Sequence, residues 1–529
     1  MKGSSAKIIL KKILRGGVKS QKDLDSLKRK AAKALKGRVL SNADLILAYR
    51  KLRGAGEIRE SESLERLLRI RKIRTLSGIA VVSVLTKPFP CPGNCLYCPT
   101  QKGIPKSYLD NEPAVMRAVL NKFDPYLQTK TRLQSLRNIG HPTDKIELIV
   151  IGGTWSFLPK NYQTWFIKRC FDACNKKESK NLERAQRLNE KTKNRIIGIT
   201  LETRPDFITE TEIKRMRKLG ATRVEIGVQS LYNDILKINR RGHKIDAVIK
   251  ATKLLKDAGL KVCYHMMPNL PGANISRDKE MFLELWRFPD FRPDLLKIYP
   301  CALLKESPLY NLWLKKKYKP YGEKQLINLL KEIKKDIPYY CRIQRLVRDI
   351  PSPSIVAGPT KISNLRQILA KEAREEGWQC KCIRCREVRE KSNPKERLFL
   401  SREDYTASEG KEIFLSLESK RRDKLYSLLR LRLPSQAFER QRHFISALRD
   451  SAIIREVHTY GELVPISRKQ KIAAQHKSLG KKLIKEAEKI AKEEFGLNKI
   501  AVISGIGAKN YYRKLGYKLN GGYMVKILD

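Results

Sequence analysis

The sequence predicts an α/β protein with a basic helical segment, a partial (β/α)6 barrel of parallel strands, a connector and a smaller α+β domain. Two patterns support this prediction. Six apolar, β-branched runs alternate with amphipathic helical stretches between residues 79 and 300, as parallel strands and crossover helices do. From about residue 396 the apolar runs follow one another closely and precede a long amphipathic helix, which indicates a separate α+β domain.

Residues 1–74 are expected to form short basic helices. They contain 22 Lys and Arg residues against 7 Asp and Glu residues, and the whole chain carries a formal net charge of +56. This charge favours a nucleic acid as partner, because each neutralised phosphate releases condensed counterions. We interpret the segment as an RNA-binding arm. A solvated helical cap on the next domain is the alternative.

The barrel is predicted for residues 75–304. Its six strands are expected at 79–85, 146–153, 196–203, 223–230, 261–268 and 295–300. Helical stretches between most of these runs supply the crossover connections that parallel strands require. In such a barrel the functional groups gather at the C-terminal ends of the strands.

Cysteine usage points to metal binding. The 11 cysteines fall in clusters, which favours metal ligation in a reducing compartment over disulfides. No apolar run approaches the roughly 18 residues that a membrane span needs, and no signal-peptide cleavage pattern follows the N-terminus. We therefore expect a cytoplasmic protein that makes no use of a membrane.

Three cysteines follow the first predicted strand in "CPGNCLYCP": Cys91, Cys95 and Cys98. A structural zinc site would need four ligands, and no fourth Cys or His lies close by in the sequence. Three thiolates can instead hold a 4Fe–4S cluster and leave its fourth iron open. The C-x3-C-x2-C spacing after a barrel strand resembles the radical S-adenosylmethionine (SAM) superfamily, in which the open iron binds SAM. The resemblance implies that Tyr97 shields the SAM adenine.

A Gly-Gly-Thr stretch, formed by Gly152, Gly153 and Thr154, ends the second predicted strand. Glycines at this place allow backbone to approach a ligand closely. In the superfamily that it resembles, this stretch holds the methionine part of SAM. An ordinary tight strand-to-helix turn is the alternative.

Polar side chains end the later strands, in "LETRPD", "GVQS" and "LKIYP". Such side chains point into the mouth of a barrel, so Glu202, Arg204 and Gln229 are expected to contact SAM or substrate. A polar network that plugs the barrel top is the alternative. Lys297 either faces the SAM or acetyl group or extends a buried stem toward the rim.

The region 396–529 contains "QHKSLGKKL" between a predicted strand and a long helix. This string resembles the Q/R-x-x-G-x-G/A loop of the GNAT acetyltransferases, which holds the pyrophosphate of coenzyme A with backbone N–H groups. The resemblance implies cofactor contacts at Gln475, His476, Lys477, Ser478, Leu479 and Gly480. Ser478 replaces a motif glycine, and its Cβ restricts close approach. An ordinary capped helix, with Ser478 as the N-cap, is the alternative.

The string "SGIGAKNYYRKLGY" near the C-terminus supplies two adjacent tyrosines. In GNAT enzymes a tyrosine near this place lies beside the thioester, where a phenol can act as an acid or an orienting donor. Tyr511 and Tyr512 are the catalytic candidates. Packing of both aromatic rings in the core is the alternative.

Strings along most of the chain from about residue 75 resemble the Elongator catalytic subunit family, the tRNA uridine carboxymethyltransferases, as a stand-alone prokaryotic-type member. They include "CLYCP", "EPAVMRA", "HMMPNLPG", "REVHTYG" and "NYYRKLGY". The resemblance implies an acyltransferase that takes an electron from a donor and uses a SAM-derived radical and acetyl-CoA. It would add a carboxymethyl group to carbon 5 of the wobble uridine, U34, in tRNA. The anticodon stem-loop would bind to the basic N-terminal segment and barrel rim, with the target base flipped out.

The same resemblance assigns a Zn²⁺ site to the connector, residues 305–395. Its ligands would be Cys380, Cys382 and Cys385 in "WQCKCIRCREV", with Cys301 or Cys341 as the fourth, in a structural role that fixes the angle between domains. A trio of reduced thiols is the alternative.

Two rival functions stay open at this point. One is a protein lysine acetyltransferase that uses only the GNAT domain, although no acidic run lies near residues 456–465. The other is an RNA-binding scaffold without activity. The sequence is compatible with a monomer or a homodimer and says nothing about other Elongator subunits.

Overall fold

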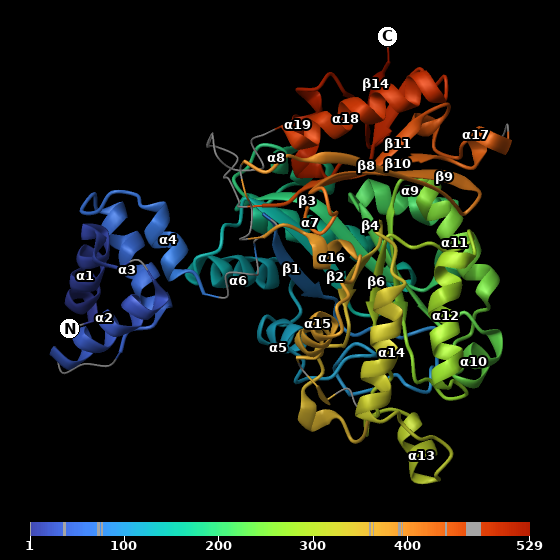
Figure 1. Ribbon diagram of the computed structural model, residues 1–529, viewed down its shortest axis with the longest axis horizontal. Coiled ribbons are helices and arrows are strands. Elements are labelled where there is room, and N and C mark those ends of the chain that lie inside the picture. The colour runs from blue at the N-terminus through green and yellow to red at the C-terminus, as the bar shows by residue number, and fades with distance from the viewer. Residues whose placement is uncertain are drawn as a thin grey trace.

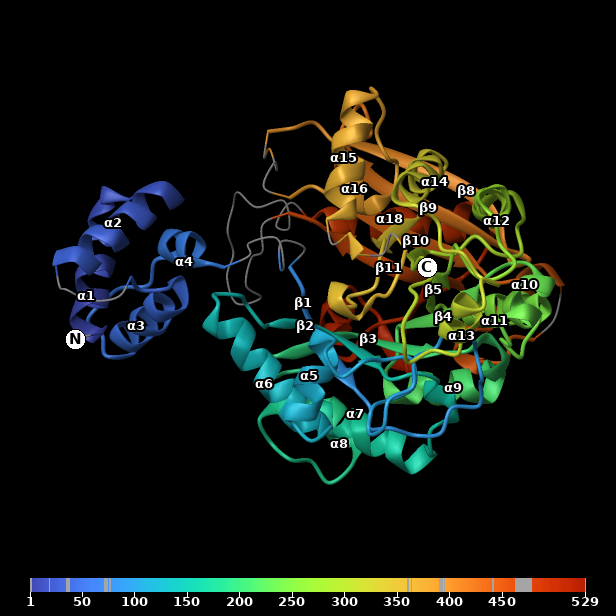
Figure 2. The same ribbon diagram turned by 90° about the horizontal axis from the view of Figure 1, so that it is seen from below.

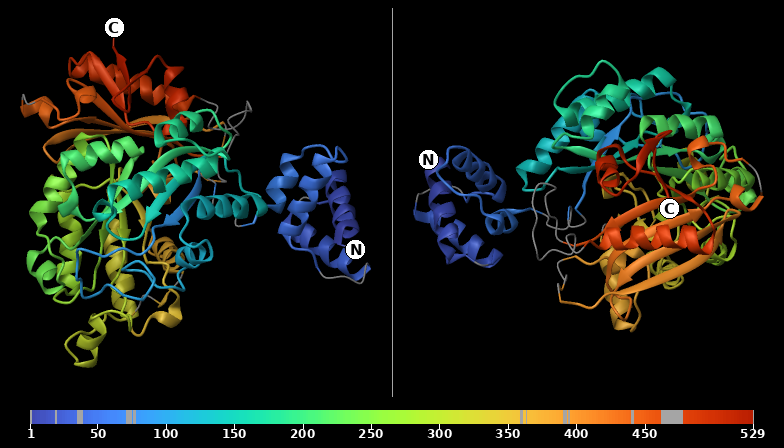
Figure 3. Two further views of the ribbon diagram at one scale, coloured as in Figure 1. Left: turned by 180° about the vertical axis from the view of Figure 1, so that it is seen from behind. Right: turned by 90° about the horizontal axis from the view of Figure 1, so that it is seen from above.

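The computed structural model describes residues 2–18, 20–34, 39–70, 75, 78–358, 361–362, 364–389, 393, 395–439, 442–461 and 478–528. It has three parts: an N-terminal helical lobe, a barrel domain around one sheet, and a C-terminal domain around a second sheet (Figure 1). The lobe lies to one side, and the two sheet domains pack against each other (Figure 3).

The N-terminal lobe contains four helices: α1 (Lys2–Lys12), α2 (Gln21–Ala34), α3 (Asn42–Gly54) and α4 (Glu62–Leu68). Ser41 begins α3 with a capping box that involves Asp44, which satisfies free N–H groups of the first turn. The lobe has its own hydrophobic core. It contacts the barrel domain where the Ile70 N–H donates to the Ile139 carbonyl at 3.1 Å, so the lobe is a separate unit on a narrow attachment.

The barrel domain is built on a seven-stranded, fully parallel sheet in the order β1 to β7. The strands are β1 (Ala80–Leu85), β2 (Lys145–Ile151), β3 (Arg195–Thr203), β4 (Arg223–Gln229), β5 (Lys261–Met266), β6 (Leu295–Ile298) and β7 (Arg342–Arg345). The first six confirm the predicted strands in their predicted order. The seventh lies inside the segment expected to be a connector, and its sequence "RIQR" has no apolar run to reveal it.

Helices α5 to α16 belong to this domain, and most of them lie on the outer side of the sheet (Figure 2). They are α5 (Pro113–Leu120), α6 (Pro125–Asn138), α7 (Lys160–Asn175), α8 (Leu182–Asn189), α9 (Glu210–Leu219), α10 (Asn233–Ile238), α11 (Ile245–Asp257), α12 (Ile275–Arg287), α13 (Leu309–Leu314), α14 (Glu323–Lys335), α15 (Leu365–Glu375) and α16 (Ile383–Arg386). Local sequence sets their ends. In α9, for example, Thr209 accepts a hydrogen bond from the Glu212 N–H, and Gly220 ends the helix with φ +94°, a conformation that glycine adopts without strain.

The C-terminal domain contains a mixed sheet in the order β13-β14-β12-β11-β10-β9-β8. Its elements are β8 (Phe399–Ala407), β9 (Gly410–Glu418), β10 (Leu425–Leu433), α17 (Gln436–Glu439), β11 (Ala452–Thr459), α18 (Leu479–Lys489), β12 (Lys499–Val502), α19 (Lys509–Arg513), β13 (Lys518–Asn520) and β14 (Tyr523–Ile527). Strands β8 to β11 form an antiparallel meander. Strand β8 was not expected from the sequence; it is an edge strand whose side chains alternate between exposed and half-buried positions.

Buried charges join the two sheet domains. Arg455 on β11 binds Asp294 of the barrel domain at 2.5 Å, and Arg432 on β10 binds Asp257 at 2.6 Å. The side chains of these four residues are fully buried, and removal of one partner from such a pair leaves an uncompensated charge. The sheet domains therefore form one tightly joined body.

The backbones of the two domains also touch. A Cβ on Gly505, just after β12, would collide with the carbonyl of Ile197 in β3. Only glycine fits at such a contact. Among the described helices, none is long and apolar enough to cross a membrane.

Candidate active site

One large cavity, of about 2110 Å³, joins the cysteine loop of the barrel domain to the C-terminal domain. Cys91, Cys95 and Cys98 line it on one side, and Gly480 and Tyr511 line it on the other. Its walls include residues from both ends of the parallel strands, so the space extends through the half-barrel. The two halves of the chain therefore share one site.

The cysteine loop follows β1 and places the three predicted ligands in the cavity wall. Arg241 donates from Nη1 to Cys95 Sγ at 3.6 Å and from Nη2 to the Gly227 carbonyl. A hydrogen bond with Cys98, helped by the charge of Arg241 and opposed by burial, lowers the pKa of Cys95 to about 5. A thiolate is the form that binds iron, so this environment suits a metal ligand.

The residues predicted to contact SAM lie beside this loop and offer free polar groups. Arg204 binds Asp206 through Nε and Nη2, but its Nη1 is buried and hydrogen-bonds to no described residue. Gln229 Oε1 is in the same situation. Buried polar atoms without partners are rare in native proteins, and here they fit a polar cofactor. Tyr97 is buried and lines the same cavity.

The two glycines of the Gly-Gly-Thr stretch both have positive φ angles, but their surroundings differ. Gly152 has φ +131°, and a Cβ there would collide with Thr86, so this glycine allows close packing of the loop after β1. Gly153 has φ +99°, and the atom nearest to a Cβ there would be the Lys106 carbonyl oxygen at 3.9 Å. Gly153 and Thr154 line the cavity, whereas Gly152 is not among the residues that line it.

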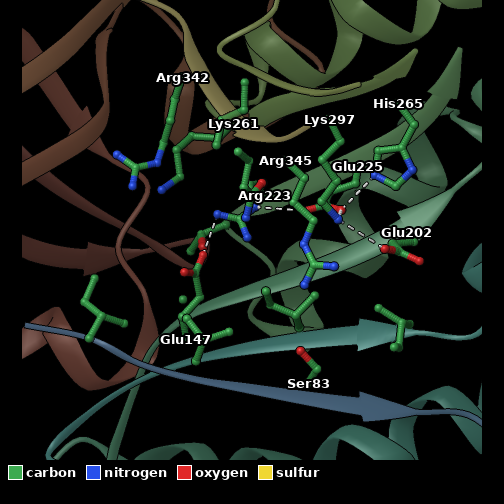
Figure 4. Close-up of a pocket in the computed structure, with 18 of the residues that line it drawn as sticks. Ser83, Glu147, Glu202, Arg223, Glu225, Lys261, His265, Lys297, Arg342 and Arg345 are labelled. Carbon is green, nitrogen blue, oxygen red and sulfur yellow. Dashed lines mark hydrogen bonds and ion pairs between the residues drawn. The ribbon is translucent and has the colours of Figure 1, made fainter. Parts of the chain in front are cut away.

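A network of buried ion pairs fills the middle of the half-barrel (Figure 4). Glu225 on β4 is its centre: it contacts Lys297 directly and lies 2.9 Å from His265 Nε2. Lys297 also reaches Glu202 at 3.4 Å, and Glu202 accepts a hydrogen bond from the Tyr108 hydroxyl at 2.9 Å. Although burial disfavours its charge, the neighbouring carboxylates raise the pKa of Lys297 above its usual value. Lys297 is thus a paired cation inside the cavity.

This network continues toward the C-terminal domain. Arg223 binds Glu147 at 2.5 Å and lies 3.5 Å from Glu225, and Lys261 binds Glu456 of β11 at 3.0 Å. None of these residues was predicted from the sequence as part of the site. A signal was present: "RVEIGVQS" carries charged or amide side chains at alternate positions of an otherwise apolar strand, and alternate positions share one face.

Strands β11 and β12 diverge at the other end of the cavity. They pair only over Ala452–Ile454, while β11 continues to Thr459. The separated edge of β11 faces the cavity with Val457 and Thr459. The backbone groups of β11 beyond Ile454 are therefore not paired with β12 on that side.

Helix α18 starts beside this opening. Ser478 precedes it with φ +55° and makes no side-chain capping bond, so the alternative of a serine-capped helix is not supported. A Cβ on Gly480 would lie 3.4 Å from the Tyr511 hydroxyl, which places the loop and this tyrosine together. Leu479 is buried against the core. The predicted contacts Gln475, His476 and Lys477 lie outside the described residues.

The two tyrosines of α19 differ in their surroundings. Both line the cavity, but Tyr511 is 39% exposed. Tyr512 is only 7% exposed, and its ring packs edge-on against Tyr511 and Tyr517. The geometry favours Tyr511 over Tyr512 as a group that meets a ligand.

Cys380, Cys382 and Cys385 form a compact cluster, with their sulfur atoms within 4.8 Å of one another. No fourth His, Cys, Asp or Glu among the residues that the structure describes completes this group. Neither Cys301 nor Cys341 has its sulfur within this distance of all three thiols, and the fourth ligand stays a prediction. Lys334 Nζ lies 3.5 Å from Cys385 Sγ. The close thiols fit three ligands of a metal ion such as Zn²⁺.

The parallel half-barrel, with three cysteines in the loop after its first strand, defines a radical SAM protein. The radical SAM superfamily profile matches residues 90–285, and the radical SAM C-terminal domain profile matches residues 293–375. The chain belongs to the Elongator complex protein 3 family within that superfamily.

Three comparisons carry this assignment. The chain is 49% identical over 469 residues to the tRNA uridine(34) acetyltransferase of Methanocaldococcus infernus, covering 86% of each chain. It is 43% identical over 474 residues to human Elongator complex protein 3, covering 86% of this chain and 85% of that one. A solved structure of M. infernus Elp3 that lacks residues 1–46 superposes with a TM-score of 0.74 and 45% identity, covering 85% of this chain and 99% of the other.

Proposed function

We propose that this protein is a tRNA uridine(34) 5-carboxymethyl transferase that uses SAM-derived radical chemistry and acetyl-CoA. One observation carries the proposal: a single cavity is lined by the cysteine loop and by the Gly480–Tyr511 region. A reaction that joins an acetyl-derived carbon to an unactivated pyrimidine needs both reactants held in one place. The names of the relatives support tRNA uridine(34) as the substrate.

In this proposal Cys91, Cys95 and Cys98 hold a 4Fe–4S cluster, and Gly153, Thr154, Arg204 and Gln229 hold SAM. When bound, this pair supplies a 5′-deoxyadenosyl radical for hydrogen abstraction. Arg241 keeps Cys95 in its ligating form through the 3.6 Å contact. The Glu225–Lys297 pair would position charged groups in the lumen.

The acetyl donor would bind at the C-terminal domain. Backbone groups at the start of α18 would hold the phosphates of coenzyme A, and the separated edge of β11 would hold its pantetheine arm. The Tyr511 hydroxyl would orient the thioester carbonyl as a hydrogen-bond donor. The three connector cysteines would bind Zn²⁺ in a structural role.

The RNA would approach from the side of the N-terminal lobe. The basic helices of that lobe would bind the backbone of the anticodon stem-loop. The target base would leave its stack and enter the cavity, as in other enzymes that act on a base.

The test is acetyl-CoA turnover by anaerobically reconstituted protein, with and without tRNA. Formation of 5′-deoxyadenosine, stimulation by tRNA, and a mass increase confined to U34 are expected. Acetylation of a lysine peptide without any tRNA requirement would instead establish the protein acetyltransferase alternative. Failure to form 5′-deoxyadenosine would support the inactive RNA-binding scaffold.

A further inference from the structure

Four arginines line the part of the cavity wall that lies next to the connector cysteines and the C-terminal domain. They are Arg342 of β7, Arg366 of α15, Arg384 of α16 and Arg389 just after α16. Within the described part of the chain, Glu387 is the only carboxylate that forms an ion pair with any of the four. This wall therefore carries an excess of positive charge.

The single carboxylate forms ion pairs with two of the arginines. Arg342 Nη2 lies 2.8 Å from Glu387 Oε2, and Arg389 Nη2 lies 2.8 Å from Glu387 Oε1. Arg342 also donates to the Tyr460 hydroxyl at 3.2 Å. One carboxylate charge thus faces four guanidinium groups, so the wall keeps a net positive charge.

Arg366 and Arg384 form no ion pair with any residue that the structure describes. Arg366 donates from Nη2 to the Ile343 carbonyl at 3.1 Å, and its Nη1 is buried without a partner. Arg384 Nε is also buried without a partner, and its side chain makes no hydrogen bond or ion pair with any described residue. Unsatisfied buried donors are costly, so two of them in one wall indicate a ligand that completes their bonding.

The chemistry of the ligand follows from the guanidinium group. Its planar fork of N–H donors matches the oxygens of a phosphate, with strong charge-assisted hydrogen bonds. A carboxylate ligand would satisfy one fork, whereas a phosphodiester offers oxygens on two sides and can bridge two arginines. The wall therefore suits a phosphate.

We propose that Arg366 and Arg384 bind a backbone phosphate of the RNA next to the nucleotide whose base enters the cavity. This inference rests on the proposed function and names the place where the RNA strand crosses the cavity wall. The base and the backbone phosphate of a nucleotide are joined through one ribose. A base inside the cavity therefore places its phosphate close to the cavity wall. The phosphates of coenzyme A are expected elsewhere, at Ser478 and Gly480, on the C-terminal domain.

The test compares Arg366→Gln and Arg384→Gln with a matched control, Arg287→Gln. Arg287 lies on α12, is 58% exposed and pairs with Glu280; it is not among the residues that line the cavity. All three variants lose one positive charge. Affinity of the full-length protein for tRNA is measured over a range of salt concentrations, and affinity for acetyl-CoA is measured in parallel.

Each cavity variant is expected to bind tRNA about tenfold more weakly, with the log–log salt slope smaller by about one. The control should keep the wild-type slope and affinity. Thermal stability and zinc content of Arg384→Gln should match those of the wild type, because the Arg384 side chain makes no bond to a described residue. This result separates loss of a ligand contact from loss of folding.

A chemical substitution locates the phosphate. An anticodon stem-loop with a neutral methylphosphonate next to U34 should bind equally to wild type and Arg384→Gln. Unchanged tRNA affinity and salt slope in both cavity variants would overturn the inference, and so would a selective loss of acetyl-CoA affinity. If the proposed function alone fails, the salt slopes will still differ but U34 will remain unmodified in the wild-type reaction.

Discussion

Asp294→Asn tests whether buried charges hold the two sheet domains together. Asp294 is fully buried and lies within 3.7 Å of three cations: Arg455 at 2.5 Å, Arg430 at 3.6 Å and Lys256 at 3.7 Å. It also accepts the Val262 N–H at 2.8 Å. Asparagine keeps an oxygen for that N–H but removes one of the carboxylates that compensate the cations, and leaves Glu412 and Glu456 to share them.

The expected loss is about 3–5 kcal/mol in the free energy of unfolding, because a buried cluster of cations loses one of its compensating charges. This is a large share of the roughly 5–15 kcal/mol that stabilises a typical domain. Urea unfolding followed by circular dichroism measures it. Asp404→Asn is the matched control, since its pairs with Arg402 and Lys411 are partly exposed and are worth only about 0–1 kcal/mol.

The effect of Asp294→Asn depends on pH. Arg455 and Lys256 outweigh burial and hold the pKa of Asp294 well below its usual value of 3.8. Its contribution is therefore fully present at neutral pH and is lost as the pH falls below about 4, where the unfolded chain takes up the proton. The difference in the free energy of unfolding between the wild type and Asp294→Asn should therefore become smaller below this pH. A loss no larger than that of Asp404→Asn at pH 7 would refute the reasoning.

Three further outcomes follow from the site. Cys98→Ala should lose iron and sulfide but keep zinc in an anaerobic metal assay, because the connector cysteines form a separate cluster; equal loss of both metals would contradict two independent sites. Glu225→Gln should lower tRNA-dependent turnover at least about tenfold, because Lys297 loses its closest partner and its position; wild-type turnover would show that the lumen network is not needed. Tyr511→Phe should lower turnover about 10²-fold or more, whereas Tyr512→Phe should leave it unchanged; the reverse order would reassign the donor.

The sequence predicted the sheet of the barrel domain well because its strands are rich in apolar, β-branched residues. Such strands appear as largely apolar runs, as in Ala80–Leu85 and Lys145–Ile151. Strand β7 was missed because "RIQR" pairs on one side only and turns its polar side chains to the cavity. Strand β8 was missed because an edge strand with one solvated face has no such run.

The candidate site was predicted only where residues lie next to a strand end or inside a local motif. Cys91, Gly153 and Gln229 belong to this class, and the cavity contains all three. The partners of these residues could not be predicted in this way. Arg241 reaches Cys95 across 146 positions, and Glu456 meets Lys261 across 195 positions. The first contact depends on how distant loops of the barrel domain come together, and the second depends on how the two sheets dock.

The backbone contact at Gly505 has a consequence for protein engineering. Because the turn after β12 rests on the Ile197 carbonyl of β3, a chimera cut near residue 396 would combine surfaces that were never fitted to each other. A transplanted C-terminal domain would pack correctly against the barrel domain only if β3 were taken from the same parent protein. Exchange of specificity between relatives is thus better attempted by grafting side chains within the lumen than by shuffling whole halves.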